Sequence, residues 1–149
     1  MSHHFLLIIH LLAATVWVGG HLYLSIGILP TVLRDRNASR LLRFEKSYEP
    51  IGMTALVLLV ITGLWMTLQF GISWHQWLSF SSPVERITSA KILLLFLTVL
   101  LAVSAQTRVI PRLKQNPAKL PEMGLHIVAV TVIGIAMLVL GSFVRYGGI

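Results

Sequence analysis

Four long apolar stretches dominate this sequence, at residues 5–33, 51–70, 87–109 and 125–144. Each is near or above the roughly 20 residues that a helix needs to cross about 30 Å of hydrocarbon. Only 11% of the residues are charged, against about 25% in a soluble domain. This excludes an ordinary cytosolic globule and a long disordered region. The sequence therefore predicts an all-α integral membrane protein with four transmembrane helices.

The connections between these stretches are short, and no internal repeat or long linker divides the 149 residues. We therefore expect one domain, residues 1–149, folded as an up-down-up-down four-helix bundle. The first stretch has no basic segment ahead of it and no small-residue cleavage site, so we expect a retained helix rather than a signal peptide. The chain has no cysteine, which excludes disulfides, thiolate zinc sites, iron–sulfur clusters and cysteine-anchored haem.

The net charge of +7 indicates an orientation rather than a ligand. Nine of the twelve Lys and Arg residues lie in the first and third connections: Arg34, Arg36, Arg40, Arg43, Lys46, Arg108, Arg112, Lys114 and Lys119. By the positive-inside rule these connections face the cytoplasm and both termini face the periplasm, in the inner membrane of a bacterium. Since this accounts for the basic residues, we expect the lipid bilayer, and not nucleic acid, as the partner.

Four ionisable side chains lie at membrane depth, namely His10, His21, Lys91 and His126. Such a group costs about 3 kcal/mol or more at the bilayer centre, so it usually faces the bundle interior and serves a function. His10 and His21 are eleven residues apart, which places them about 20° apart around a helix and about 16 Å apart along it. Trp17 lies on the same stripe.

Depth groups these side chains into two layers. In the expected orientation His10 and Lys91 lie at the outer level, and His21 and His126 lie at the inner level. Met53 could join the inner layer. Met137, eleven residues after His126, could approach the outer one.

Two kinds of chemistry suit such layers. Imidazoles on facing helices are common axial ligands of haem b, which needs no cysteine. Imidazole together with thioether also suits copper. We favour haem because small residues flank the histidines where a porphyrin needs space. These residues are Ala13, Ala14, Gly19 and Gly20.

The predicted ligands of the haem or metal are His10, His126 and His21, with Trp17 packed against the porphyrin. Lys91 is the predicted catalytic residue, as a ligand or as a charge partner of a propionate or substrate. Arginines at either level could also pair with propionates; they are Arg86, Arg145, Arg108 and Arg112. A structural reading stays open for each residue type, because membrane histidines can bond across helices, lysines can reach the interface and methionines usually pack.

One stretch of the first helix, His10-Leu-Leu-Ala-Ala-Thr-Val-Trp17-Val-Gly-Gly-His21-Leu-Tyr-Leu, resembles the first helix of the copper-resistance D (CopD) family of bacterial membrane proteins. It is also similar to the related HemJ-type protoporphyrinogen oxidases. Further similarities to these groups follow along the chain: Arg43-Phe44-Glu45-Lys46 with Thr62-Gly63-Leu64-Trp65, then Lys91-Ile-Leu-Leu-Leu, then Ala105-Gln106-Thr107-Arg108 with Pro111-Arg112-Leu113.

The two resemblances imply different functions. The oxidases imply His10 and Lys91 as haem-ligand positions, whereas the copper-resistance family implies copper handling. Two departures argue against protoporphyrinogen oxidation. Ser89 stands where the oxidases have a His two residues before their Lys, and Gly124-Leu-His126-Ile stands where they have an Asn-Glu-x-Pro motif.

From the sequence we predict a haem b-binding inner-membrane protein that carries out electron transfer or quinone-linked oxidation. Its small-molecule partner would be a quinone or a porphyrin-like molecule. The alternative is a copper transport or copper-tolerance protein, and a third reading is a structural membrane subunit. The sequence leaves open whether the chain is an enzyme, which would then be a haem-dependent oxidoreductase, and whether it forms a homo-oligomer.

Overall fold

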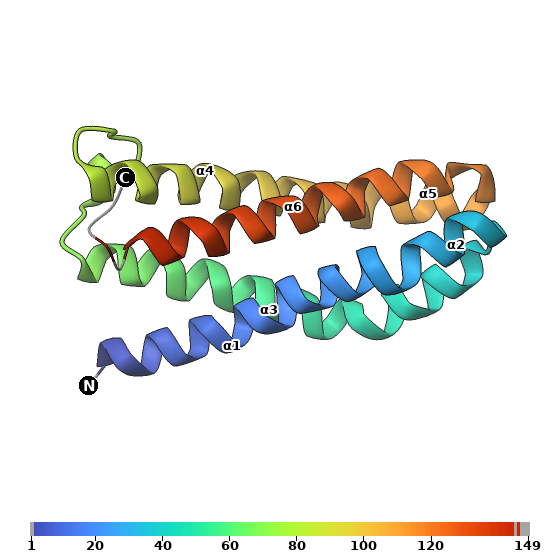
Figure 1. The fold of residues 1–149 in the computed structure, drawn as a ribbon, viewed down its shortest axis with the longest axis horizontal. Helices are drawn as coiled ribbons and strands as arrows, with labels where there is room; N and C mark the ends of the chain where they lie inside the picture. The colour runs from blue at the N-terminus through green and yellow to red at the C-terminus, as the bar shows by residue number, and fades with distance from the viewer. Residues whose placement is uncertain (1, 145, 147–149) are drawn as a thin grey trace.

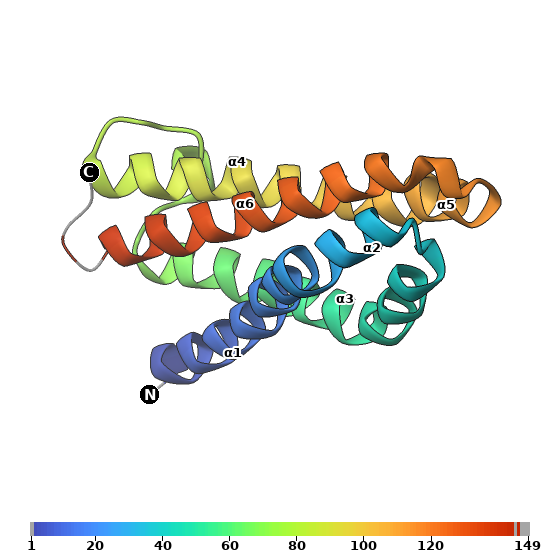
Figure 2. The same cartoon turned by 45° about the vertical axis from the view of Figure 1, so that its right-hand side comes forward.

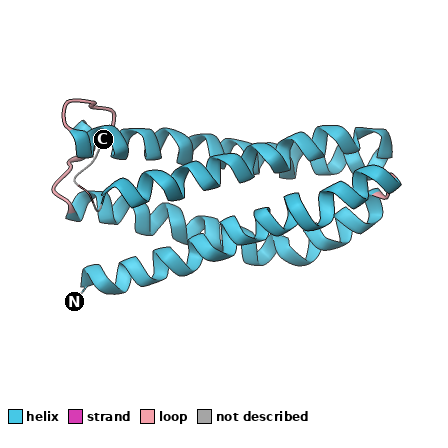
Figure 3. Cartoon of the chain, viewed as in Figure 1, coloured by secondary structure: helices cyan, strands magenta, loops and turns pink. Residues whose placement is uncertain are grey.

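The chain is helical almost throughout the computed structural model, which describes residues 2–144 and 146, and no strand occurs in those residues. Four helical spans run back and forth along the longest axis (Figure 1), and loops are confined to the ends of the bundle (Figure 3). Each span is long and apolar enough to cross a membrane: His3–Asp35, Ala38–Gln69, Pro83–Gln115 and Pro117–Val144. The predicted all-α, four-span membrane fold is confirmed.

The described residues form six α-helices and four short segments of other helix types, of which η2 lies between two spans. In chain order the elements are α1 (Ser2–Tyr23), η1 (Leu24–Ile28), α2 (Leu29–Asp35), α3 (Ala38–Gln69), η2 (Trp74–Gln76), α4 (Pro83–Ser104), η3 (Ala105–Val109), α5 (Ile110–Gln115), η4 (Pro117–Lys119) and α6 (Leu120–Val144). The segments η1 and η3 are π-helical, with wider turns than an α-helix, and η2 and η4 are 3₁₀ turns.

The first and third spans share one construction, in which a long helix passes through a π-helical segment into a short helix. A proline follows each segment, Pro30 in α2 and Pro111 in α5. Proline lacks an N–H, and its ring clashes with the carbonyl four residues earlier. A π-turn accommodates this without breaking the helix, and such turns often occur at functional sites.

The second span begins well before its predicted start at residue 51. The side-chain oxygen of Asn37 caps α3 by accepting a hydrogen bond from the Arg40 amide at 3.2 Å. With 32 residues the helix is about 48 Å long, which is longer than the roughly 30 Å thickness of the hydrocarbon core. The first turns of α3 are helical but polar, so the apolar pattern did not predict them.

The other helices also extend past their predicted bounds. The third span continues to Gln115 rather than residue 109, and α6 begins at Leu120 rather than residue 125. The third span begins at Pro83, where the Ser82 hydroxyl accepts a hydrogen bond from the Glu85 amide at 3.2 Å. The apolar stretches therefore mark the parts of the helices that match the hydrocarbon, and hydrogen-bonded caps mark their ends.

The four spans form two helical hairpins. In one, α1 lies along α3, and in the other, α4 lies along α6. The main helix contact between the hairpins is that of α1 with α6. Figures 1 and 2 show the α4–α6 hairpin on one side of the bundle and the α1–α3 hairpin on the other. The seam between the hairpins is where the candidate site lies.

Two clusters of buried apolar side chains fill the bundle. The central cluster draws on all four spans and consists of Ala13, Trp17, Val18, Ala55, Leu56, Ala102 and Val130. The end cluster lies toward α2 and α5 and consists of Leu24, Ile28, Leu29, Val32, Ala38, Leu41, Val109, Ile110, Leu113, Leu120, Met123 and Ile127. Many large apolar side chains on the outside are exposed, such as Ile26 at 73%, as expected for a surface that faces lipid.

Candidate functional site

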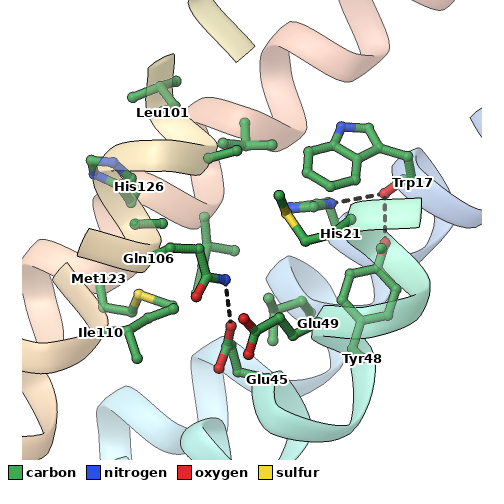
Figure 4. Close-up of a pocket in the computed structure, with 17 residues that line it drawn as sticks. Trp17, His21, Glu45, Tyr48, Glu49, Leu101, Gln106, Ile110, Met123 and His126 are labelled. Atoms are coloured by element: carbon green, nitrogen blue, oxygen red, sulfur yellow. Dashed lines mark hydrogen bonds between the residues drawn. The ribbon is translucent and has the colours of Figure 1, made fainter. Parts of the chain in front are cut away.

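A cavity of about 70 Å³ lies between the two hairpins, with walls from all four spans. Most of its lining is apolar, but several side chains that can bind a cation also reach it (Figure 4). Its polar and sulfur-bearing side chains are His21, Glu45, Tyr48, Glu49, Met53, Gln106, Met123 and His126, with the indole of Trp17 beside them. Both π-helical segments contribute, η1 through Leu24 and η3 through Ala105 and Gln106.

His21 is held in one tautomer by its own helix. Its Nδ1 lies 2.8 Å from the carbonyl oxygen of Trp17, and a carbonyl oxygen can only accept. Nδ1 therefore carries the hydrogen, and the lone pair of His21 is on Nε2. A backbone hydrogen bond of this kind is the usual way in which proteins orient a metal-binding imidazole.

His126 approaches the same cavity from α6 (Figure 4). Its Nε2 is buried and has no hydrogen-bond partner among the residues that the structure describes. Leaving a buried polar atom unpaired costs about 1–3 kcal/mol, so this nitrogen remains available to a ligand. The two histidines predicted for the inner layer are thus brought together at one cavity.

Thioether sulfurs accompany these imidazoles. Met53 of α3 lines the cavity, where the sequence placed it in the inner layer, and Met123 of α6, which the sequence analysis missed, lines it too. Met137, proposed for the outer layer, is half-buried and does not line the cavity. The cavity therefore combines nitrogen and sulfur donors.

The polar wall from α3 was also missed by the sequence analysis. Glu45, Tyr48 and Glu49 precede the predicted start of the second helix, so they were assigned to a connection. The carboxylate of Glu45 accepts a 3.0 Å hydrogen bond from the side-chain amide of Gln106. The four-residue spacing of Glu45 and Glu49 was the available signal, because it places both carboxylates on one helix face.

The outer layer is separate from this cavity. His10 Nδ1 lies 2.8 Å from the hydroxyl of Thr62, and that hydroxyl donates to the carbonyl of Leu58 at 2.5 Å. The Thr62 oxygen therefore accepts from His10, which leaves the lone pair of His10 on Nε2. Lys91 is close enough for its charge to act on His10. Neither residue lines the cavity.

The space predicted for a porphyrin is filled by protein beside Gly20, where an added methyl group would overlap the ring of Tyr48. Ala14 is buried, whereas Ala13 borders a separate apolar groove of about 480 Å³ between α1 and α3 that no histidine lines. Gly19 does have open space beside it but is exposed. A cavity of about 70 Å³ is also far below the roughly 300–1,000 Å³ of pockets for drug-sized molecules. The argument from small residues was therefore wrong at Gly20, and the cavity beside His21 and His126 gives no support to haem b.

The arginines predicted to pair with propionates do not reach the cavity. Arg86, Arg108 and Arg112 are exposed, and Arg112 pairs with Glu122 at 3.4 Å. Arg145 lies outside the described residues. Within the part of the chain that the structure describes, no three His, Cys, Asp or Glu side chains are grouped closely enough to hold a metal ion. Thioether sulfurs are the further donors that the cavity offers a metal beside its two imidazoles.

The fold and the cavity define a multi-pass membrane protein with an internal cavity that nitrogen- and sulfur-bearing side chains line. A family model described as CopD, copper resistance protein D, matches residues 42–144. The chain belongs to this family, as the sequence resemblance predicted. No curated protein and no solved structure matches the chain.

The matched residues contain the cavity residues of α3, η3 and α6. The first span, which carries His10, Trp17 and His21, lies outside the match. A relationship to the HemJ-type oxidases is not shown by these comparisons. Family membership therefore supports a copper-related membrane function and gives no support to haem, oxidoreductase activity or electron transfer.

Proposed function

We propose that this protein transports copper in the bacterial inner membrane and takes Cu(I) into the cavity between its two hairpins. Membership of the copper resistance protein D family supports a copper-related function. The copper alternative stated from the sequence thereby replaces haem-linked redox chemistry as the main hypothesis.

The observation that carries the proposal is that His126, whose buried Nε2 has no hydrogen-bond partner among the described residues, lines the same cavity as His21. The lone pair of His21 is on Nε2, because its Nδ1 donates to Trp17. Thioether and imidazole ligands both suit copper, and thioether sulfur in particular selects Cu(I). Met53 and Met123 supply that sulfur at the same cavity.

The carboxylates favour a cation over a neutral ligand. Glu45 and Glu49 are half-buried and line the cavity. A cation loses hydration on entering an apolar region, and a nearby negative charge offsets that cost. The same charges would repel an anionic ligand such as a haem propionate. The cavity is therefore better suited to a positive ion.

The location of the cavity suits transport. It lies toward α2 and α5, the end that we expect to face the cytoplasm, and the central cluster separates it from His10 and Lys91. An ion that crossed the membrane would have to pass this cluster, so the two hairpins would have to move relative to one another. Movement of one helical unit against another around a shared site is a common mode of membrane transport.

Copper binding by the purified protein tests the proposal. The protein is extracted in mild detergent and titrated with Cu(I) under reducing conditions against a chromophoric chelator. We expect one copper per chain, and we expect His21→Ala and His126→Ala each to weaken binding about tenfold or more, which is about 1.4 kcal/mol. His75→Ala is the control, because His75 is exposed in η2.

The same preparation distinguishes the other hypotheses. A Soret band that disappears in His10→Ala would support the haem hypothesis and contradict ours. A colourless protein that binds no copper would contradict our proposal and support the hypothesis of a structural membrane subunit. Copper uptake into vesicles that contain the protein, compared with vesicles that contain His126→Ala, then tests transport itself.

A further inference from the structure

The ring of Tyr48 occupies a slot formed by two glycines on facing helices. A methyl group on Gly20 of α1 would overlap the ring, and one on Gly52 of α3 would come within 2.7 Å of its Cε1 atom. Real Cβ atoms are not found so close to another atom, so both positions need glycine while the ring stays in place. The slot holds Tyr48 against α1 beside the cavity.

The hydroxyl of Tyr48 fixes the other end of the side chain. It donates toward the carbonyl oxygens of Val16 at 2.9 Å and Trp17 at 3.2 Å. The Trp17 oxygen is the same atom that accepts from Nδ1 of His21. Figure 4 shows the two hydrogen bonds meeting at this atom. Tyr48 and His21 are therefore held by a common acceptor.

The ring of Tyr48 also limits the orientation of the His21 imidazole. The Trp17 ring lies 4.4 Å from the imidazole, measured between ring centroids, and the Tyr48 ring meets it edge-on at 5.9 Å. The other face of Tyr48 stacks on Phe44 at 5.6 Å. Since the surrounding rings limit rotation of the imidazole, its Nε2 keeps one direction.

We infer that Tyr48 is a positioning residue for the copper site: its ring limits the rotation of the His21 imidazole, whose Nδ1 donates to the Trp17 carbonyl, and so keeps Nε2 available to Cu(I). This inference rests on the proposed function for the identity of the ion. The orientation of His21 is a property of the protein without copper. The inference therefore makes one prediction that needs no metal and one that does.

The metal-free test is the tautomer of His21, read by ¹⁵N NMR of the histidine-labelled protein and assigned with His21→Ala. Gly20→Ala displaces the Tyr48 ring without altering Tyr48 itself. Gly19→Ala is its matched control, since a methyl group on Gly19 meets nothing within 4 Å. We expect the Nδ1–H signature in the wild type, in Gly19→Ala and in Tyr48→Phe, which keeps the ring, and a mixture of tautomers in Gly20→Ala, where the displaced ring lets the imidazole rotate away from the Trp17 carbonyl.

The copper test uses the same variants with Cu(I) and a competing chelator. Loss of a group that orients a metal ligand costs about 10–100-fold in affinity, so we expect Gly20→Ala to bind about tenfold more weakly than Gly19→Ala. Tyr48→Phe keeps the ring and should fall between them. Gel filtration establishes that each variant is folded before it is compared.

The outcomes separate this inference from the proposed function. A folded Gly20→Ala protein with the wild-type tautomer, or with wild-type copper affinity, would overturn the role of Tyr48. A wild-type protein that binds no copper would overturn the proposed function. In that case a change of tautomer in Gly20→Ala but not in Gly19→Ala would still establish that the Tyr48 ring positions His21.

Discussion

The side-chain amide of Gln106 donates a 3.0 Å hydrogen bond to the carboxylate of Glu45 across the seam between the two hairpins. Gln106 belongs to the π-helical segment η3 and Glu45 to α3, and both line the cavity. A second polar contact crosses the seam where Ser25 and Thr131 lie 2.6 Å apart. The hairpins are therefore joined near the cavity by specific hydrogen bonds as well as by apolar packing.

Replacing Gln106 by Leu should destabilise the protein. The variant leaves the half-buried carboxylate of Glu45 without its donor, which costs about 1–3 kcal/mol. Unfolding in detergent measures the loss of stability. Gln69→Leu is the control, because the hydrogen bond between Gln69 and His3 is exposed. A double-mutant cycle with Glu45→Ala should give a coupling energy of about 1 kcal/mol. A coupling energy near zero would show that the contact does not join the hairpins.

His126→Leu should separate copper binding from stability. The substitution removes a buried nitrogen that has no partner among the described residues, so the free energy of unfolding should stay the same or rise by about 1 kcal/mol. His21→Leu is the comparison, since it loses the hydrogen bond to Trp17 and should cost about 1 kcal/mol. Both variants should lose copper binding. Equal destabilisation by the two would mean that Nε2 of His126 is already paired in the protein without copper.

Thr62→Val should cost more than Thr98→Val, although both threonines are buried and each donates to the carbonyl four residues earlier. Thr62 also accepts from His10, so its loss leaves the His10 N–H without an acceptor. We expect a difference of about 1 kcal/mol in the free energy of unfolding. If the two variants unfold alike, the His10–Thr62 hydrogen bond adds nothing to stability.

The four-span fold could be predicted because a membrane-spanning segment needs about twenty apolar residues in a row. In lipid such a segment must also satisfy its own backbone hydrogen bonds, which a helix does. The ends of the helices could not be predicted in this way. Hydropathy reports which residues match the hydrocarbon, whereas α3 begins where Asn37 caps it, among residues that are charged and helical. The three residues of α3 that form the polar wall were missed for this reason.

That His21 and His126 reach the same region of the bundle could also be predicted, because short connections fix how far along the bundle each residue lies. Depth alone does not show what fills the space between them. Gly20 indicated room for a flat cofactor, but a glycine equally admits a neighbouring side chain, and the ring of Tyr48 takes that place. Only the packing of α1 on α3 distinguishes these outcomes, and it depends on contacts across 28 residues of sequence.

The orientation of the chain remains a prediction, and its lack of cysteine makes it directly testable by single-cysteine labelling. The basic residues place the connection between α5 and α6 in the cytoplasm and the one between α3 and α4 in the periplasm. In intact cells, Ser81→Cys should react with a membrane-impermeant maleimide, whereas Ala118→Cys should react only after permeabilisation. Both positions are exposed and outside the α-helices. The reverse pattern would place the copper cavity nearer the periplasm, so that the central cluster would close it from the cytoplasm instead.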